Sequence, residues 1–220
     1  MPSADKVLKT IQEMPYSENT PLIQRVWDCL IASAVLLLTL PLQLVIAIAV
    51  RLDSPGPVLF QQWRVGRYGL PFRFRKFRTM VANADDLSPH KLKTYSSSEL
   101  GQLYFKVPRD RRVTRIGAFL RATSLDELPS LFNVVCGEMA LVGPRPEVLE
   151  VLPYYAHESL IKFSVRPGIT GLAQVSGRSR LKFLEGLELD CQYVRRRSPL
   201  LDLQIFLRTF VVVLRRDGAF

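Results

Sequence analysis

CLIASAVLLLTLPLQLVIAIAV (Cys29–Val50) is a run of 22 residues without a single charge. As a helix it would be long enough to cross the hydrocarbon core of a bilayer. Pro41 lies just past its middle, where proline removes one backbone hydrogen bond and clashes with the preceding turn, so we expect a kink. Two interpretations follow. Hydropathy alone favours a kinked spanning helix, and the alternative is a re-entrant helix-break-helix that returns to the same face. Periodicity does not separate them.

The flanks of this run set the expected organisation of the chain. Residues 1–24 are polar and contain Pro15 and Pro21, which predicts a loose leader. Arg25 and Arg51 lie on either side of the run, so the positive-inside rule does not orient it. The run begins late and lacks a small-residue cleavage pattern, which argues against a signal peptide. We therefore expect a polar leader (1–24), a membrane segment (25–51) and a folded domain (52–220).

Composition narrows the class of partner without fixing it. The chain has 220 residues, enough for one ordinary domain, and 30 Lys+Arg against 20 Asp+Glu give a net charge of +10. Such a balance suits nucleic acid, an anionic membrane surface or phosphorylated small molecules. The three cysteines are scattered, with no metal spacing and no disulfide framework, which is typical of a reducing compartment.

A β-hairpin is predicted directly after the apolar run. DSPGP (53–57) is a turn signal, Val58–Phe60 and Phe72–Arg75 read as strands, and the latter alternates with period 2. Between Ser54 and Ala84 the chain has no acid and six basic residues, which are Arg64, Arg67, Arg73, Arg75, Lys76 and Arg78. A solvated strand face, contact with lipid headgroups and contact with substrate phosphates all remain open.

Helices are predicted further along the chain, which makes the fold class α+β and mainly α-helical. Arg115–Leu120 suggests a short helix, and Ser198–Arg216 a longer one with Pro199 at its first position. The longer helix has a wide apolar side bracketed by arginines. It is either a core helix or an interfacial amphipathic helix on an anionic leaflet.

Asp126 and Glu127 are the only acids between Arg111 and Gly137, in a stretch rich in arginine. A purely structural interpretation is a capping box, with Ser124 at the N-cap and Glu127 at N3, although Pro129 predicts an irregular helix start. The functional interpretation divides two roles between the acids, because adjacent carboxylates diverge on a helix. One would attack as a nucleophile, and the other would bind a divalent cation such as Mg²⁺ beside a substrate phosphate.

Two rigid turns add fixed arginines. GPRP (143–146) presents Arg145, and RPGITG (166–171) presents Arg166. The sequence has no glycine-rich P-loop and no dinucleotide fingerprint, which argues against a nucleotide-hydrolysing motor or a dehydrogenase.

Five motifs in order resemble the bacterial sugar transferase family, the monotopic polyprenyl-phosphate phosphoglycosyl transferases. The resemblance runs from about Arg25 to Arg216, through RVWDCLIASAVLLL, LDSPGPVLFQQWRVGRYGLPFRFRKFRTM, RVTRIGAFLRATSLDELPSLFNVVCGEMALVGPRP, VRPGITGLAQVSGR and ELDCQYV. It implies transfer of a sugar 1-phosphate from a UDP-sugar to a polyprenyl phosphate, usually undecaprenyl phosphate, with release of UMP. This reaction would begin the membrane stage of exopolysaccharide, O-antigen, capsule or glycoprotein glycan assembly.

The resemblance also implies roles for individual residues. Asp126 matches the nucleophile that forms a covalent phospho-sugar intermediate, and Glu127 matches the residue that helps to bind Mg²⁺, with Mn²⁺ as an alternative. The membrane element of the family is a re-entrant helix-break-helix, which here would break at Leu40 and Pro41. The matching positions near the phosphates or uridine are Lys76, Arg78, Arg121, Pro144, Arg145, Pro146 and Arg166.

This chain departs from the family pattern at three positions. Leu40 stands where a serine often precedes the break proline, Glu138 replaces an aspartate, and Ala140 replaces a serine. The first change removes one hydrogen-bonding group that would hold the break, and the other two are conservative.

The resemblance implies the bacterial inner (cytoplasmic) membrane, with the catalytic domain on the cytoplasmic face of an anionic bilayer and no nucleic-acid partner. The chain matches a minimal catalytic form without an additional N-terminal membrane domain. Two other hypotheses stay open, a membrane-tethered basic binding protein without catalysis and a glycosyltransferase that releases UDP. The sequence does not reveal the sugar, the glycan pathway or whether a homo-oligomer forms.

Overall fold

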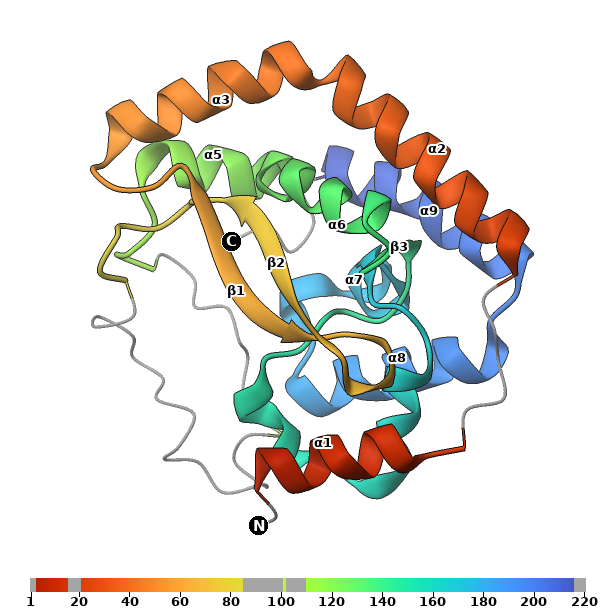
Figure 1. Cartoon of the computed structure of the whole chain (residues 1–220). Coiled ribbons are helices and arrows are strands. Elements are labelled where there is room, and N and C mark those ends of the chain that lie inside the picture. The colour runs from red at the N-terminus through yellow and green to blue at the C-terminus, as the bar shows by residue number, and fades with distance from the viewer. Residues whose placement is uncertain (1–2, 16–20, 85–100, 102–109, 216–220) are drawn as a thin grey trace.

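The computed structural model of the chain describes residues 3–15, 21–84, 101 and 110–215. Helices α2 (Leu22–Leu38) and α3 (Leu40–Asp53) form a long bent arm along the top of the molecule in Figure 1. Three helices lie beneath this arm, namely α5 (Arg115–Thr123), α6 (Leu131–Val135) and α9 (Pro199–Arg215). The hairpin of β1 (Leu59–Val65) and β2 (Pro71–Phe77) descends from the arm, and α1 (Ala4–Glu13) closes the opposite end. The mainly helical α+β class predicted from the sequence is therefore confirmed.

The kink predicted in the apolar run is present as a break of 62° between α2 and α3. Among the described helices, none is by itself long and apolar enough to cross a membrane, whereas this bent pair together reaches the necessary length and composition. Thr39 Oγ1 donates to the carbonyl of Val35 (2.6 Å), and Gln43 Nε2 donates to Thr39 Oγ1 (3.0 Å). Hydroxyl and amide groups thus hold the break, although Leu40 lacks the hydroxyl of the family pattern.

The predicted hairpin is confirmed, and its strands are longer than expected. Strand β1 (Leu59–Val65) pairs antiparallel with β2 (Pro71–Phe77), joined by the 3₁₀ turn η1 (Arg67–Gly69). Alternation puts Phe72, Phe74 and Lys76 on one face, of which the two phenylalanines are buried. The hairpin therefore carries a lysine at the end of an apolar face.

A second, parallel pair of short strands was not predicted. Strand β3 (Ala140–Val142) pairs with β4 (Gly168–Thr170). Each strand has only three residues, which is too few to show a period-2 pattern in the sequence. The sequence therefore predicted only the two rigid turns, and not the strands beside them.

Short helices make up most of the remaining chain. The predicted helices at Arg115–Leu120 and Ser198–Arg216 are confirmed as α5 and α9. The bounds are α5 (Arg115–Thr123), η3 (Leu125–Ser130), α6 (Leu131–Val135), η4 (Leu149–Tyr154), η5 (His157–Ser164), α7 (Leu172–Ser176), η6 (Arg178–Arg180), α8 (Phe183–Arg196) and α9 (Pro199–Arg215).

The leader is not loose over its described first part. Residues Ala4–Glu13 form helix α1, which has Ser3 as its N-cap and buries Val7 and Ile11 against η4 and the hairpin turn. An apolar pair at spacing i, i+4 supplies the contact. The prediction of a loose leader was based on its prolines and charged residues, and it did not take account of the apolar pair Val7 and Ile11.

Three apolar clusters form the core of the described structure. One joins α1 to η4, η5 and α8, and the largest joins α2, β2, α6, β3 and α9. The third is small and contains Ile46 and Val50 of α3, Phe77 of β2 and Leu120 of α5. This last cluster fixes the end of the arm above the segment that carries Asp126.

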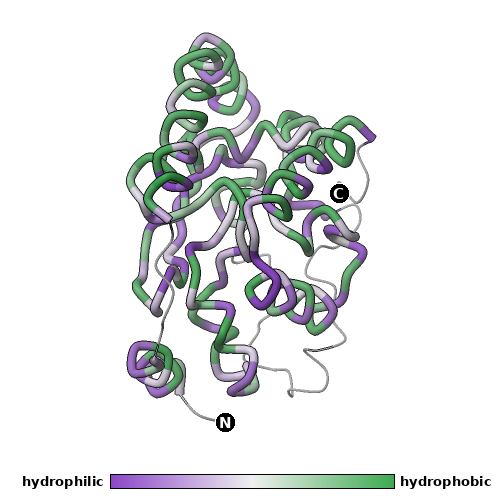
Figure 2. Tube along the Cα trace, turned by 90° about the vertical axis from the view of Figure 1, so that its right-hand side faces the viewer, coloured by the Kyte–Doolittle hydropathy of each residue, from purple (hydrophilic) through white to green (hydrophobic). Residues whose placement is uncertain are grey.

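Large apolar side chains remain exposed on the arm and on α9. The arm is largely hydrophobic in Figure 2. In α9 only Ile205 is buried, so the core-helix interpretation is wrong for most of its length. The exposed residues of these helices are Leu22, Ile23, Val26, Trp27, Leu30, Leu37, Leu38, Leu40, Leu42, Leu44, Val45, Ile48, Leu52, Leu200, Leu203, Leu207, Phe210, Val211 and Leu214.

Helix α5 approaches the end of β2 so closely that only glycine fits between them. A Cβ placed on Gly117 would lie 2.1 Å from the carbonyl oxygen of Thr79, whereas one on Gly186 of α8 meets nothing within 4 Å. We predict that Gly117→Ala lowers the free energy of unfolding by about 3 kcal/mol. Gly186→Ala should raise it by up to about 1 kcal/mol, because alanine is the better helix former. Denaturant unfolding of both variants checks this, and equal effects would contradict the packing.

Candidate active site

Asp126 and Glu127 lie in the 3₁₀ helix η3, between α5 and α6. Asp126 is buried, while Glu127 is partly exposed. With about three residues per turn, neighbouring side chains in a 3₁₀ helix diverge by about 120°. The two carboxylates can therefore serve different surroundings, as the predicted division of roles requires.

The irregular start expected from Pro129 is confirmed, since the α-helical turns begin only at Leu131. The capping box is not formed. Ser124 has a left-handed backbone (φ 57°) and makes no side-chain cap bond. Its Oγ instead accepts from Arg178 Nη2 at 2.7 Å. Arg178 belongs to the VSGR motif but was not among the predicted site residues.

Two cations act on Asp126. Burial lowers the pKa of Lys76 to about 8, an effect that the Asp126 carboxylate opposes and the Arg145 and Arg121 guanidiniums reinforce. Burial likewise lowers the pKa of Arg121, again opposed by Asp126. Arg121 is held in place by Nε donation to Thr79 Oγ1 (3.0 Å). A buried carboxylate thus faces positive charge from β2 and from α5.

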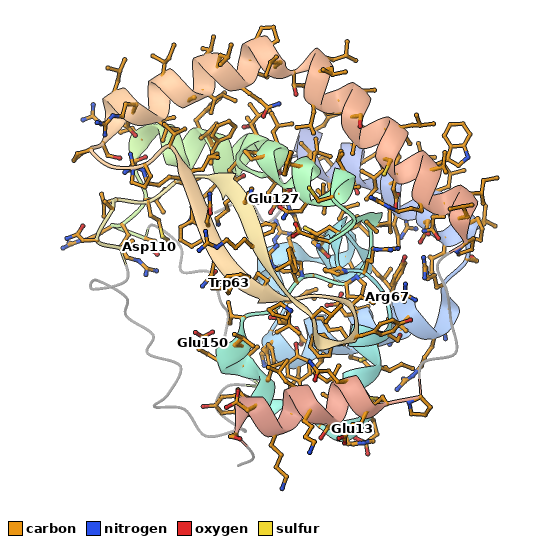
Figure 3. All side chains as sticks on the ribbon, viewed as in Figure 1. Glu13, Trp63, Arg67, Asp110, Glu127 and Glu150 are labelled. Carbon is orange, nitrogen blue, oxygen red and sulfur yellow. The ribbon has the colours of Figure 1, made fainter. Side chains whose placement is uncertain are left out.

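Glu127 faces the GPRP turn across a small open pocket. Its Oε1 lies 3.9 Å from Arg145 Nη1. Figure 3 shows Glu127 beside the upper end of the hairpin, beneath the helices. The pocket is lined by Arg64, Phe74, Glu127, Arg145, Pro146, Gly168 and Ile169. An anionic group entering here would meet two arginines and one carboxylate.

The sequence pattern identifies Arg64 only as one of six basic residues between Ser54 and Ala84. Its Nη1 donates to the carbonyl of Pro146 (3.2 Å), and burial lowers its pKa to about 10, with Arg145 acting in the same direction. The signal that could have identified it is the pairing of strands. Arg64 lies opposite Phe72, on the face that also carries Lys76.

The two rigid turns are joined by the backbone of β3 and β4. Gly143 N donates to the carbonyl of Thr170 (2.9 Å), and Gly168 N donates to that of Pro144 (2.8 Å). A Cβ on Gly168 would lie 2.1 Å from Gly143 N, so this approach requires glycine. Pro144 and Pro146 are buried, and Arg145 projects between them.

Arg78 and Arg166 lie at helix ends, and the structure does not bring them to the carboxylate pair. Arg78 donates to the carbonyls of Ser54 (2.6 Å) and Val50 (3.4 Å), at the C-terminal end of α3. Arg166 Nε donates to the carbonyl of Gly137 (2.8 Å), just after α6. Cations at helix C-termini are stabilising. Their contact with substrate stays a prediction.

Asn133 is a further residue that the sequence did not indicate. It is fully buried in α6, and its Nδ2 donates to the carbonyl of Arg73 (2.7 Å) and to Glu138 Oε2 (2.6 Å). Its Oδ1 accepts from the N–H of Arg75 (3.2 Å). The Asn133 side chain therefore holds β2, which carries Lys76, to the η3–α6 segment, which carries Asp126. Glu138 accepts the second hydrogen bond of the Asn133 amide.

The donor chemistry fits Mg²⁺ that arrives with a diphosphate. Within residues 3–15, 21–84, 101 and 110–215, no group of three or more His, Cys, Asp or Glu could form a metal cage. Mg²⁺ is usually held by one or two carboxylates together with substrate phosphates. Glu127 lines the pocket as such a carboxylate.

Comparison with known proteins gives a match over most of the chain. The model of the bacterial sugar transferase family matches residues 19–216. A UDP-galactose-lipid carrier transferase of Erwinia amylovora is 41% identical over 90% of this chain and 42% of its own length. A UDP-glucose:undecaprenyl-phosphate glucose-1-phosphate transferase of Escherichia coli is 38% identical over 91% of this chain and 42% of its own.

The relatives differ in how much of their length corresponds to this chain. It spans less than half of the three relatives from Haemophilus influenzae, Erwinia amylovora and Salmonella typhimurium. The exopolysaccharide production protein ExoY of Rhizobium meliloti is 38% identical over 90% of this chain and 88% of its own length.

The charge of Lys76 offers a direct test of the site. We predict that its amine titrates near pH 8 and is charged below that value. Asp126→Asn should move the pKa of Lys76 lower still, because the carboxylate that favours the charged form is removed. NMR titration of ¹³C-methylated lysines measures this, with the signal assigned by its loss in Lys76→Arg. An unchanged or higher pKa in Asp126→Asn would contradict the placement of the two groups.

Proposed function

The chain belongs to the bacterial sugar transferase family, and on that basis we propose that it transfers a sugar 1-phosphate from a UDP-sugar to undecaprenyl phosphate and releases UMP. The observation that carries the proposal is a buried carboxylate, Asp126, placed among Lys76, Arg121 and Arg145. Such a group can attack an anionic phosphate only where cations offset the repulsion.

The names of the relatives guide the choice of substrates. Those from Erwinia amylovora and Escherichia coli are named for UDP-galactose and UDP-glucose, and the latter for undecaprenyl phosphate. We extend these classes to this chain as UDP-hexose donor and polyprenyl-phosphate acceptor. ExoY is named for exopolysaccharide production, which favours polysaccharide assembly as the process served.

In the proposed reaction an oxygen of Asp126 attacks the phosphorus that carries the sugar. A bond forms between that oxygen and the phosphorus, the phosphoanhydride bond breaks, and UMP leaves with the electron pair. An oxygen of undecaprenyl phosphate then attacks the same phosphorus and frees Asp126. One diphosphate replaces another, so no separate energy source is required.

The residues around Asp126 would orient the donor and neutralise its negative charge. Lys76 and Arg121 favour the ionised form of Asp126 and offset charge on the phosphate. Arg145 faces Glu127 across the pocket, where the donor diphosphate would lie between them. Mg²⁺ bound by Glu127 would polarise the phosphate oxygens.

Contacts at both ends of the arm support the re-entrant arrangement. At the start of α2, Arg25 Nη2 donates to the carbonyl of Val135 (2.8 Å). At the end of α3, Asp53 Oδ2 accepts from the N–H of Ile116 (2.9 Å). Because Ile116 and Val135 belong to one compact segment, these contacts favour an arrangement in which both ends of the arm lie on the same side of a bilayer. We propose that α2, α3 and α9 embed their apolar faces in the inner membrane, with the site on the cytoplasmic side, where UDP-sugars are made.

The first prediction of this proposal concerns Asp126. The wild-type protein should release UMP from UDP-glucose or UDP-galactose in the presence of undecaprenyl phosphate. Asp126→Asn should lower the rate by about 10³-fold or more, because the nucleophile is removed. Nucleotide release by the purified protein in detergent, resolved by chromatography, measures both. Release of UDP would indicate an ordinary glycosyltransferase, and unchanged UMP release by Asp126→Asn would exclude this nucleophile.

Glu127→Gln serves as the companion variant. It should retain measurable activity but need about tenfold more Mg²⁺ for half-maximal rate, because a neutral amide is a weaker ligand. If the Mg²⁺ dependence were the same as that of the wild type, Glu127 would not be the metal-binding carboxylate.

The topology predicts the labelling of single cysteines at Pro21 and Pro57, which are exposed on either side of the arm. In a variant without the native cysteines, Pro21→Cys and Pro57→Cys should both resist a membrane-impermeant maleimide in intact cells. Both should react in inside-out vesicles. Labelling of Pro21→Cys in intact cells would contradict the re-entrant arrangement and favour the kinked spanning helix.

A further inference from the structure

A buried cluster of three charged residues lies beneath the GPRP turn. Lys162 of η5 is only 3% exposed, and its Nζ lies 2.6 Å from Glu147 Oε1 and 2.8 Å from Asp190 Oδ2 of α8. Lys162 Nζ also donates to the hydroxyl of Tyr155 (3.4 Å). Nothing in the proposed chemistry uses these residues.

This cluster is a poor device for stability. Burying three charged groups costs desolvation energy that mutual attraction repays only partly. Burial raises the pKa of Asp190 even though Lys162 acts to lower it, so the charged form of this carboxyl is disfavoured. Burial alone would lower the pKa of Lys162, but Asp190 and Glu147 outweigh it and raise that pKa well above its usual range. Lys162 therefore stays charged. A cluster that contributes little to stability is better explained if it positions the neighbouring backbone.

The cluster acts on the backbone that carries Arg145. In Pro144-Arg145-Pro146 the prolines have no N–H, so Arg145 supplies the only backbone donor. Arg145 and Lys162 line one small pocket at this turn, and the Arg145 N–H lowers the pKa of the Asp190 carboxyl. Glu147 follows directly, bound by its side chain to Lys162 and by its carbonyl to the N–H of Val65 (2.8 Å).

The other side of the same turn faces the site. The guanidinium of Arg145 is about half exposed and lies 3.9 Å from Glu127. A shift of the turn would move this guanidinium relative to the carboxylate pair, and small misplacements of binding groups are costly in rate.

We propose that Lys162, Glu147 and Asp190 form a positioning cluster that holds the GPRP turn and aims Arg145 at the donor diphosphate. The kinetic part of this inference rests on the proposed function, while the structural part does not. Asp190 and Lys162 thus act through Arg145 without touching the substrate.

Asp190→Asn is the informative variant, because it leaves Lys162 and Glu147 as a neutral pair. We expect an unchanged or higher Tm, together with a fall of about tenfold in kcat/KM for the UDP-sugar. In an Arg145→Ala background the same substitution should have no further effect on kcat/KM. Independent fold losses that multiply would overturn the inference, since the cluster would then act elsewhere.

Hydrogen exchange gives a readout that does not depend on activity. Arg145 has the only amide hydrogen of the Pro-Arg-Pro segment, so its exchange reports the turn itself. Asp190→Asn should speed this exchange by about tenfold or more, and an unchanged rate would overturn the proposal. If the wild type released no UMP, the proposed function would fail while this readout still decided the structural part.

Leu187→Ala is the matched control, one turn before Asp190 on α8. Leu187 is buried in the apolar cluster that α8 shares with α1, η4 and η5. The variant should lower Tm without changing kcat/KM or the exchange of Arg145. If Asp190→Asn behaved in the same way as Leu187→Ala, the cluster would be structural only. Glu147→Gln also leaves a neutral pair and replaces Asp190→Asn if that variant does not fold.

Discussion

The segment from Arg115 to Val135 has to touch both ends of the apolar arm and the basic strand at once, and the rest of the structure depends on this constraint. Asp53 binds its first turn, Arg25 binds its last carbonyls, and Asn133 ties it to the backbone of β2. Asp126 lies between these attachments. The position of Asp126 relative to the arm is therefore fixed by hydrogen bonds at each end.

The positive charge of the chain is divided between two tasks. Arg25, Arg78 and Arg166 donate to carbonyls at helix ends, where they offset helix dipoles. Lys76 and Arg121 instead act on Asp126. The net charge of +10 is thus a poor measure of what is offered to a partner. The second group contributes to the field in which a buried carboxylate and an anionic substrate can coexist.

The parts of the fold that the sequence could predict are those set by local patterns. The hairpin, α5, α9 and the break near Pro41 follow from alternation, amphipathic spacing and the missing N–H of proline. The pair β3–β4 and the bonds of Asn133 depend on contacts between distant segments, which no local window contains. The same holds for the site. A motif identifies Arg78 and Arg121 equally well, but only tertiary structure shows that the former faces carbonyls and the latter approaches Asp126.

A reaction that exchanges one diphosphate for another asks the protein mainly for geometry and charge. In the part of the chain that the structure describes, a small pocket beside Glu127 is lined by the rigid turns and by Arg64 and Arg145. A lipid acceptor whose chain stays in the bilayer needs no pocket for its hydrocarbon, because the membrane already solvates it. What remains is to bring two phosphates to one carboxylate at a fixed depth. In the proposed arrangement the bent arm would set that depth, and the GPRP turn would contact the donor from the aqueous side.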